Sequence, residues 1–131
     1  MTTTIKILLS VLFLSLAALS NAGMDSIQHH YKTSFANNLD EQFWNPEISW
    51  KNKYINHDPT QGRIMWLFLK KPVIFTDGWH LIKAFMILFI VLSILVWIKG
   101  KWYLKFIYVL AGGLIWGTSF ELFYNKKWKK K

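Results

Sequence analysis

One stretch of the sequence decides the fold: residues 79–98, which read WHLIKAFMILFIVLSILVWI. Its only two ionisable side chains, His80 and Lys83, lie in the first turns. Twenty residues at about 1.5 Å each make a helix about 30 Å long, which matches the hydrocarbon core of a bilayer. The tryptophans near both ends of the stretch suit the two headgroup regions. The sequence therefore predicts a transmembrane helix over residues 79–98.

A second apolar stretch, residues 102–121, has the same length and follows the linker Lys99-Gly100-Lys101. Because so short a linker joins neighbouring antiparallel helices, residues 79–124 are expected to form a transmembrane helical hairpin. Residues 125–131 then form a basic tail.

The second stretch contains a pair of small residues, Gly113 and Gly117, in the pattern G-x-x-x-G. Glycines at this spacing let another membrane helix approach closely. The expected neighbour is the first helix of the hairpin. The alternative is a homo-oligomer that forms through the same two glycines.

Residues 1–22 have the three regions of a secretory signal peptide. Lys6 provides a positive charge, residues 7–19 are apolar or carry hydroxyl groups, and Ser20-Asn21-Ala22 supplies small residues before a cleavage site. We predict cleavage between Ala22 and Gly23, because the apolar run covers only about 20 Å of the bilayer core. The alternative is an uncleaved first transmembrane helix. In both cases the chain after Gly23 begins on the outer side of the membrane.

Residues 23–78 are predicted to form an outer segment with an amphipathic helix at its start. Large apolar residues recur at helical spacing between residues 24 and 43, with polar residues between them. The dipeptide Asn45-Pro46 is expected to end this helix, and residues 45–62 are expected to form irregular turns. The apolar stripe consists of Met24, Ile27, Tyr31, Phe35, Leu39 and Phe43, and the rings expected at the headgroup level are those of Trp44, Trp50 and Tyr54.

The composition agrees with a membrane protein and excludes several other classes. Hydrophobic residues make up 53% of the chain and charged residues 18%, with a net charge of +9. Much of the positive excess lies in the basic tail, so no nucleic-acid-binding face is needed to explain it. The chain has no cysteine, which excludes a disulfide scaffold, a thiolate zinc site and a cysteine nucleophile.

The signal peptide predicts the orientation of the chain in the membrane, with residues 23–78 on the outer side. This orientation places Lys99, Lys101 and Lys105 on the cytoplasmic side, as the positive-inside tendency prefers. It places the basic tail outside, which the same tendency disfavours. We retain the orientation because a signal peptide is the stronger indicator and the tail is short.

Four ionisable residues, Asp77, His80, Lys83 and Glu121, are expected near the outer membrane boundary. His80 lies twenty residues before Gly100 and Glu121 twenty-one after it, so an antiparallel hairpin brings the two to one depth. Asp77, His80 and Lys83 are spaced by three and share one side of the helix. Because ionisable groups at this depth mark functional sites, the four are candidate catalytic residues.

The alternative gives the same residues structural roles. In both cases Thr76-Asp77-Gly78 is predicted to form a turn and an N-cap; in the structural alternative His80 caps the helix start. Lys83 extends to the headgroups and pairs with Glu121.

The remaining histidines, His29, His30 and His57, lack the spacing of metal ligands, because the sequence has no H-x-x-x-H or H-E-x-x-H pair. No G-x-S-x-G, Walker or G-x-G-x-x-G motif occurs either. We therefore expect neither a metal nor a cofactor.

Two strings of the sequence resemble those of small uncharacterised membrane proteins of Bacteroidetes-type bacteria. They are FWNPEISWKNKY at residues 43–54 and FTDGWHLIK at residues 75–83. The resemblance covers residues 28–90 and rests mainly on the distinctive pattern W-N-P-x-I-S-W-K-N-K-Y. It implies a setting in the bacterial envelope. It transfers no catalytic residue.

Together these features predict an all-α integral membrane protein of the bacterial inner membrane, with residues 23–78 on the periplasmic side. We expect it to be non-enzymatic and to bind lipid headgroups or a partner protein through its outer segment. The first alternative is a small membrane enzyme acting on lipid headgroups, with His80 as acid or base and Asp77 or Glu121 orienting it. The second is a phage-type membrane-permeabilising protein, which also combines an apolar hairpin with a basic tail but requires that tail to lie inside.

Overall fold

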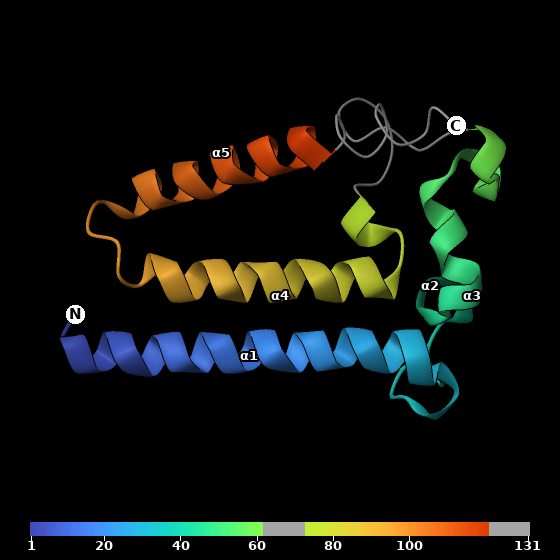
Figure 1. Cartoon of the computed structure of the whole chain (residues 1–131), viewed down its shortest axis with the longest axis horizontal. Helices are drawn as coiled ribbons and strands as arrows, with labels where there is room; N and C mark the ends of the chain where they lie inside the picture. The colour runs from blue at the N-terminus through green and yellow to red at the C-terminus, as the bar shows by residue number, and fades with distance from the viewer. Residues whose placement is uncertain (62–72, 121–131) are drawn as a thin grey trace. The chain divides into compact units, whose positions relative to one another are not determined.

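The computed structural model of the chain describes residues 1–61 and 73–120, with side chains described as far as residue 115 (Figure 1). Within these ranges the structure consists of helices joined by turns, and it has no strand. The chain divides into two compact units, Met1–Ser93 and Ile94–Lys131. The α-helices are α1 (Thr3–His30), α2 (Glu41–Trp44), α3 (Pro46–Ser49), α4 (Gly78–Leu95) and α5 (Trp102–Phe120), and the 3-10 turns are η1 (Tyr31–Thr33), η2 (Trp50–Lys53), η3 (Ile55–His57), η4 (Pro59–Gln61) and η5 (Val73–Phe75).

Two helical segments of the described chain are long and apolar enough to cross a membrane, Thr3–Thr33 and α4. A long apolar helix is therefore confirmed over most of residues 79–98, although it ends at Leu95, three residues early, and its insertion in a membrane stays a prediction. A helix is also confirmed over most of residues 102–121, as α5. The hairpin arrangement of α4 and α5 stays a prediction.

In the first unit, α1 and α4 run antiparallel and side by side (Figure 1). Near one end the Ser10 hydroxyl donates to the Ser93 carbonyl oxygen at 3.0 Å. Near the other end the Ile82 side chain lies 3.7 Å from the place that a Cβ on Gly23 would take. Because Ser10 and Gly23 are small, they let the two helices approach closely.

The prediction of a long amphipathic helix over residues 24–43 is wrong for the second half of that range. The helix ends at His30, and the Ser34 hydroxyl then binds backbone at two points, donating to the Tyr31 carbonyl oxygen and accepting from the Ala36 N–H. A serine that binds nearby backbone in this way offers the chain an alternative to the helix. Ile27 of the predicted stripe is fully buried, whereas Phe35, beyond the break, is 57% exposed.

Asn45 separates α2 from α3 and has the extended backbone expected before Pro46, but the helix that it ends is the four-residue α2 and not the predicted long helix, which already ends at His30. The backbone N–H of Asn45 donates to the Glu41 carbonyl oxygen, so this residue closes α2. Its side-chain oxygen accepts from the Glu47 N–H at 3.0 Å and starts α3, which has Pro46 in its first turn. The short helical turns that follow, up to Gln61, agree with the irregular segment predicted there.

The second unit contains the end of α4, the linker and α5. Gly100 has a φ of +126°, a conformation that only glycine adopts without strain. The Lys105 ammonium donates to the Leu95 carbonyl oxygen at 3.1 Å, and this bond satisfies one of the free carbonyl groups at the end of α4.

Candidate functional site

The first unit has a junction where the outer segment meets the start of α4. The Trp44 ring lies against Gly78, the first residue of that helix. A Cβ at Gly78 would lie 2.7 Å from Cζ3 and 2.9 Å from Cδ2 of this ring, so only glycine lets the ring pack so closely. The contact brings together the two strings at residues 43–54 and 75–83.

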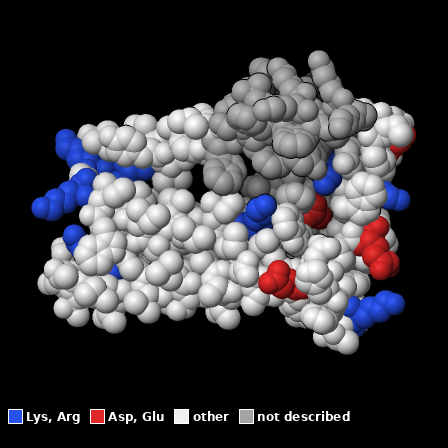
Figure 2. Space-filling model, in the orientation of Figure 1, with Lys and Arg blue, Asp and Glu red and all other residues white. Residues whose placement is uncertain are grey.

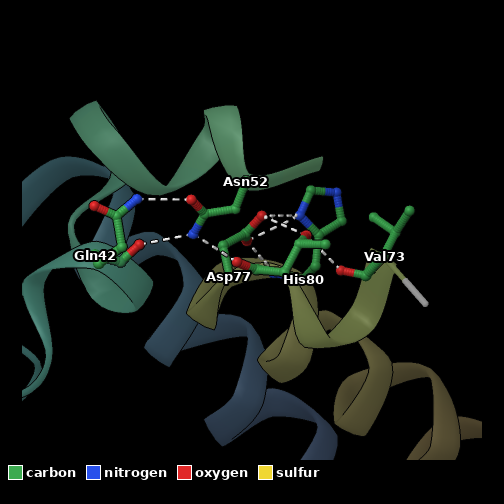
Figure 3. A network of polar contacts seen from close by, with 6 residues as sticks. Gln42, Asn52, Val73, Asp77 and His80 are labelled. Atoms are coloured by element: carbon green, nitrogen blue, oxygen red, sulfur yellow. Dashed lines mark hydrogen bonds and ion pairs between the residues drawn. The ribbon is translucent and has the colours of Figure 1, made fainter. Parts of the chain in front are cut away.

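Asn52 makes a second connection across the junction (Figure 3). Its side-chain amide donates to the carbonyl oxygens of Gln42 at 2.7 Å and Thr76 at 2.8 Å. Its side-chain oxygen accepts from the Gln42 amide at 2.7 Å. One side chain therefore joins three segments, namely α2, η2 and the turn before α4.

Asp77 is the N-cap of α4, as the sequence predicts. Its Oδ1 accepts from the His80 backbone N–H at 2.9 Å, although its residue surface is only 2% exposed. The Thr76 hydroxyl donates to the Val73 carbonyl oxygen at 2.7 Å and lies 3.2 Å from Asp77 Oδ2. A buried carboxylate needs such partners, because burial without them costs several kcal/mol.

The His80 ring is the main partner of this carboxylate. Its Nδ1 lies 2.7 Å from Asp77 Oδ2 and 2.9 Å from Oδ1, and its side chain is 27% exposed. In the neutral ring, Nδ1–H then donates to the carboxylate and Nε2 is left as an acceptor. No residue in the described ranges forms a hydrogen bond with Nε2. An imidazole oriented in this way can accept a proton.

The other predicted site residues do not join this pair. The Lys83 ammonium lies over the Trp79 ring, 4.7 Å from its centroid, although Lys83 follows His80 by three residues. Glu121 lies outside the described residues. A Cβ at Gly113 would meet no described heavy atom within 4 Å, and Gly117 lies beyond the described side chains, so helix packing at the two glycines stays a prediction.

The described residues contain no cluster of three or more metal-ligating side chains. Within the outer segment, Asp58 closes a turn by accepting from the backbone N–H and the hydroxyl of Thr60, at 2.9 Å and 2.7 Å. These bonds favour the charged form and hold the pKa of the Asp58 carboxyl below its usual value. Asp58 therefore carries a negative charge at neutral pH.

Comparison with known proteins gave no match: no protein-family model matches the sequence, and no curated protein or solved structure matches it either.

Sequence reasoning missed the two contacts that build the junction. Asn52 lies between two lysines in a segment without periodicity, so no pattern marks it as a connecting residue. The glycine at position 78 follows an N-cap aspartate, which gives no indication of a ring packed on it.

Proposed function

We propose that the protein is a small, non-enzymatic component of the bacterial inner membrane that binds lipid headgroups or a partner protein through its outer segment. One observation carries the proposal: the attachment of the outer segment to the first turn of α4, by Trp44 on Gly78 and by Asn52 on Thr76. The first turn of a spanning helix lies near the headgroups. A segment attached there is held at the membrane surface.

The surface of the outer segment suits this location. It leaves several large apolar side chains exposed, which lipid at the membrane surface can cover. At the headgroup depth such side chains are stabilised because they leave water for lipid, and tryptophan rings are especially common there. They include Phe35, Leu39, Trp50, Ile55 and Phe75.

Long uncharged stretches within α1 and α4 support insertion in the membrane. Residues 7–24 of α1 and residues 84–95 of α4 contain no Asp, Glu, Lys or Arg. Figure 2 shows the corresponding surface as almost entirely uncharged, with acidic side chains towards the outer segment. A surface of this kind is stable against lipid tails.

The proposed orientation predicts which parts of the chain are accessible from outside. Because the chain has no cysteine, single cysteines at Asn38, Gly100 and Asn125 can be labelled with an impermeant maleimide in intact spheroplasts. We expect labelling at Asn38 and Asn125 and none at Gly100 until the membrane is permeabilised. Labelling at Gly100 alone would show that the chain has the opposite orientation. It would also place the basic tail inside, as the permeabilising alternative requires.

The contact between Asp77 and His80 favours a second candidate function, a membrane enzyme acting on lipid headgroups. A carboxylate 2.7 Å from Nδ1 fixes the orientation of the ring and leaves Nε2 to face a substrate, an arrangement that many general bases share. The same contact is also explained by capping alone, because Asp77 accepts the His80 backbone N–H as well.

A further inference from the structure

A cluster of two rings and two lysines lies on η2 and the residue after it. The rings of Trp50 and Tyr54 pack edge to face, with their centroids 5.8 Å apart. The Lys51 ammonium lies 5.8 Å from the Trp50 centroid, and the Lys53 ammonium 5.5 Å from the Tyr54 centroid. Each cation is therefore placed beside the face of one ring.

The cluster is held in place from two sides. The Trp50 indole N–H donates to the Glu47 carbonyl oxygen at 3.1 Å, which fixes that ring. Asn52, between the two lysines, binds inward to Gln42 and Thr76. Neither Lys51 nor Lys53 forms an ion pair with a described carboxylate. Two positive charges are thus presented, without a neutralising partner among the described residues, on a segment attached to the start of α4.

We propose that this cluster, Trp50, Lys51, Lys53 and Tyr54, binds the phosphate groups of anionic phospholipids at the bilayer surface. The inference rests on the proposed function and names the lipid class and the site. The rings prefer the headgroup depth, and the ammonium groups then meet the lipid phosphates. The pair of Lys83 and Trp79, in the first turns of α4, repeats the same combination in the same unit.

Lipid binding can be measured on the full chain in detergent by native mass spectrometry, with phosphatidylglycerol or phosphatidylcholine added in steps. We expect phosphatidylglycerol to bind more tightly. Lys51→Gln and Lys53→Gln should each weaken its binding about fivefold, the contribution of one lysine near an anionic surface. The double substitution with arginine, Lys51→Arg with Lys53→Arg, should retain it because the charge is kept.

Lys32→Gln is the matched control, because Lys32 is an exposed lysine of η1 that also lies in the outer segment. An equal loss in Lys32→Gln would show that overall charge, and not this cluster, attracts the lipid. Equal binding of both lipids by the native chain would overturn the inference. The inference would also be overturned if inorganic phosphate, at the same concentration as phosphatidylglycerol, fully displaced the lipid. If these results come from a chain that resists carbonate extraction from membranes and labels as expected at Asn38, the proposed function stands and only the lipid site fails.

A separate observation concerns α1, which continues without a break through the predicted cleavage site. Ala22 and Gly23 lie inside this helix, seven or more residues before its end at His30. Cleavage after Ala22 would remove the hydrogen bond between Ser10 and the Ser93 carbonyl oxygen. It would also leave α4 without most of α1, the helix that packs beside it.

We infer that α1 is retained as a membrane helix paired with α4, in place of the predicted cleavage. Several of its apolar side chains are more than half exposed, as expected for a helix that faces lipid on its other sides; they include Leu8, Val11, Leu12 and Leu19.

The pairing can be tested by disulfide formation in membranes. Ser10→Cys with Ser93→Cys should cross-link on mild oxidation, whereas Leu8→Cys with Ser93→Cys should not, because residues 8 and 10 point to opposite sides of the helix. Intact mass spectrometry of the purified chain should give a mass near 15.5 kDa. A chain that starts at Gly23 would overturn the inference and establish the signal peptide. Equal cross-linking of both pairs would overturn the pairing alone.

Discussion

Gly78→Ala is expected to lower the unfolding free energy of the protein by about 2–3 kcal/mol, the usual cost of overpacking a close contact. The added methyl group would lie within 3.0 Å of three carbon atoms of the Trp44 ring, so the ring must leave its place or α4 must shift. Unfolding in detergent, followed by circular dichroism, measures the change.

Two variants separate this contact from a general effect of the substitution. Gly112→Ala replaces a glycine inside α5 where a Cβ would meet no described atom within 4 Å. It should be neutral or slightly stabilising, because alanine is the better helix former. In a Trp44→Ala background, Gly78→Ala should lose most of its effect. If Gly78→Ala costs as much without the ring as with it, the ring does not pack there.

Asp77→Ala is expected to cost about 3 kcal/mol of unfolding free energy. The substitution removes a helix cap, worth about 1 kcal/mol, and leaves the His80 ring without its buried partner. Asp40 provides the matched control, because it caps α2 from an exposed position by accepting from the Gln42 N–H. Asp40→Ala should cost 1 kcal/mol or less by the same measurement. Equal losses in the two variants would mean that only capping matters at Asp77.

The substitution His80→Gln tests the enzyme candidate, because it separates a structural role of His80 from a chemical one. The reconstituted protein is incubated with phospholipid vesicles, and ³¹P NMR follows the headgroup signals. A structural role predicts the same unchanged spectra for the native chain and for His80→Gln. New headgroup signals with the native chain, lost in a well-folded His80→Gln variant, would identify His80 as the base and contradict the non-enzymatic proposal.

The features that the sequence predicts well depend on neighbouring residues. The helix of residues 79–98 follows from a long apolar run, and the cap at Asp77 follows from a short acidic side chain before that run. The extended backbone at Asn45 follows from the restriction before proline, although the helix that ends there is the short α2 and not the predicted long one. The prediction of one helix over residues 24–43 was wrong. It relied on a stripe of apolar residues that continues past Ser34, but the Ser34 hydroxyl competes there for backbone hydrogen bonds.

The junction could not be predicted, because its contacts join residues far apart in the chain. Asn52 and Thr76 are separated by 24 positions, and Trp44 and Gly78 by 34. Spacing rules apply within one helix or turn, so they could bring Asp77 and His80 together but could not add Asn52 or Trp44. They also suggested a common site for Lys83, whose long side chain instead reaches Trp79.

The end of α4 has a consequence for the membrane around it. With 18 residues the helix is about 27 Å long, some 3 Å less than an average hydrocarbon core. Two of its last carbonyl oxygens accept from the Ser10 hydroxyl and the Lys105 ammonium, so this end does not depend on water for them. In the proposed membrane setting, a span of this length has a small hydrophobic mismatch, and we expect the lipid next to this end of α4 to thin locally.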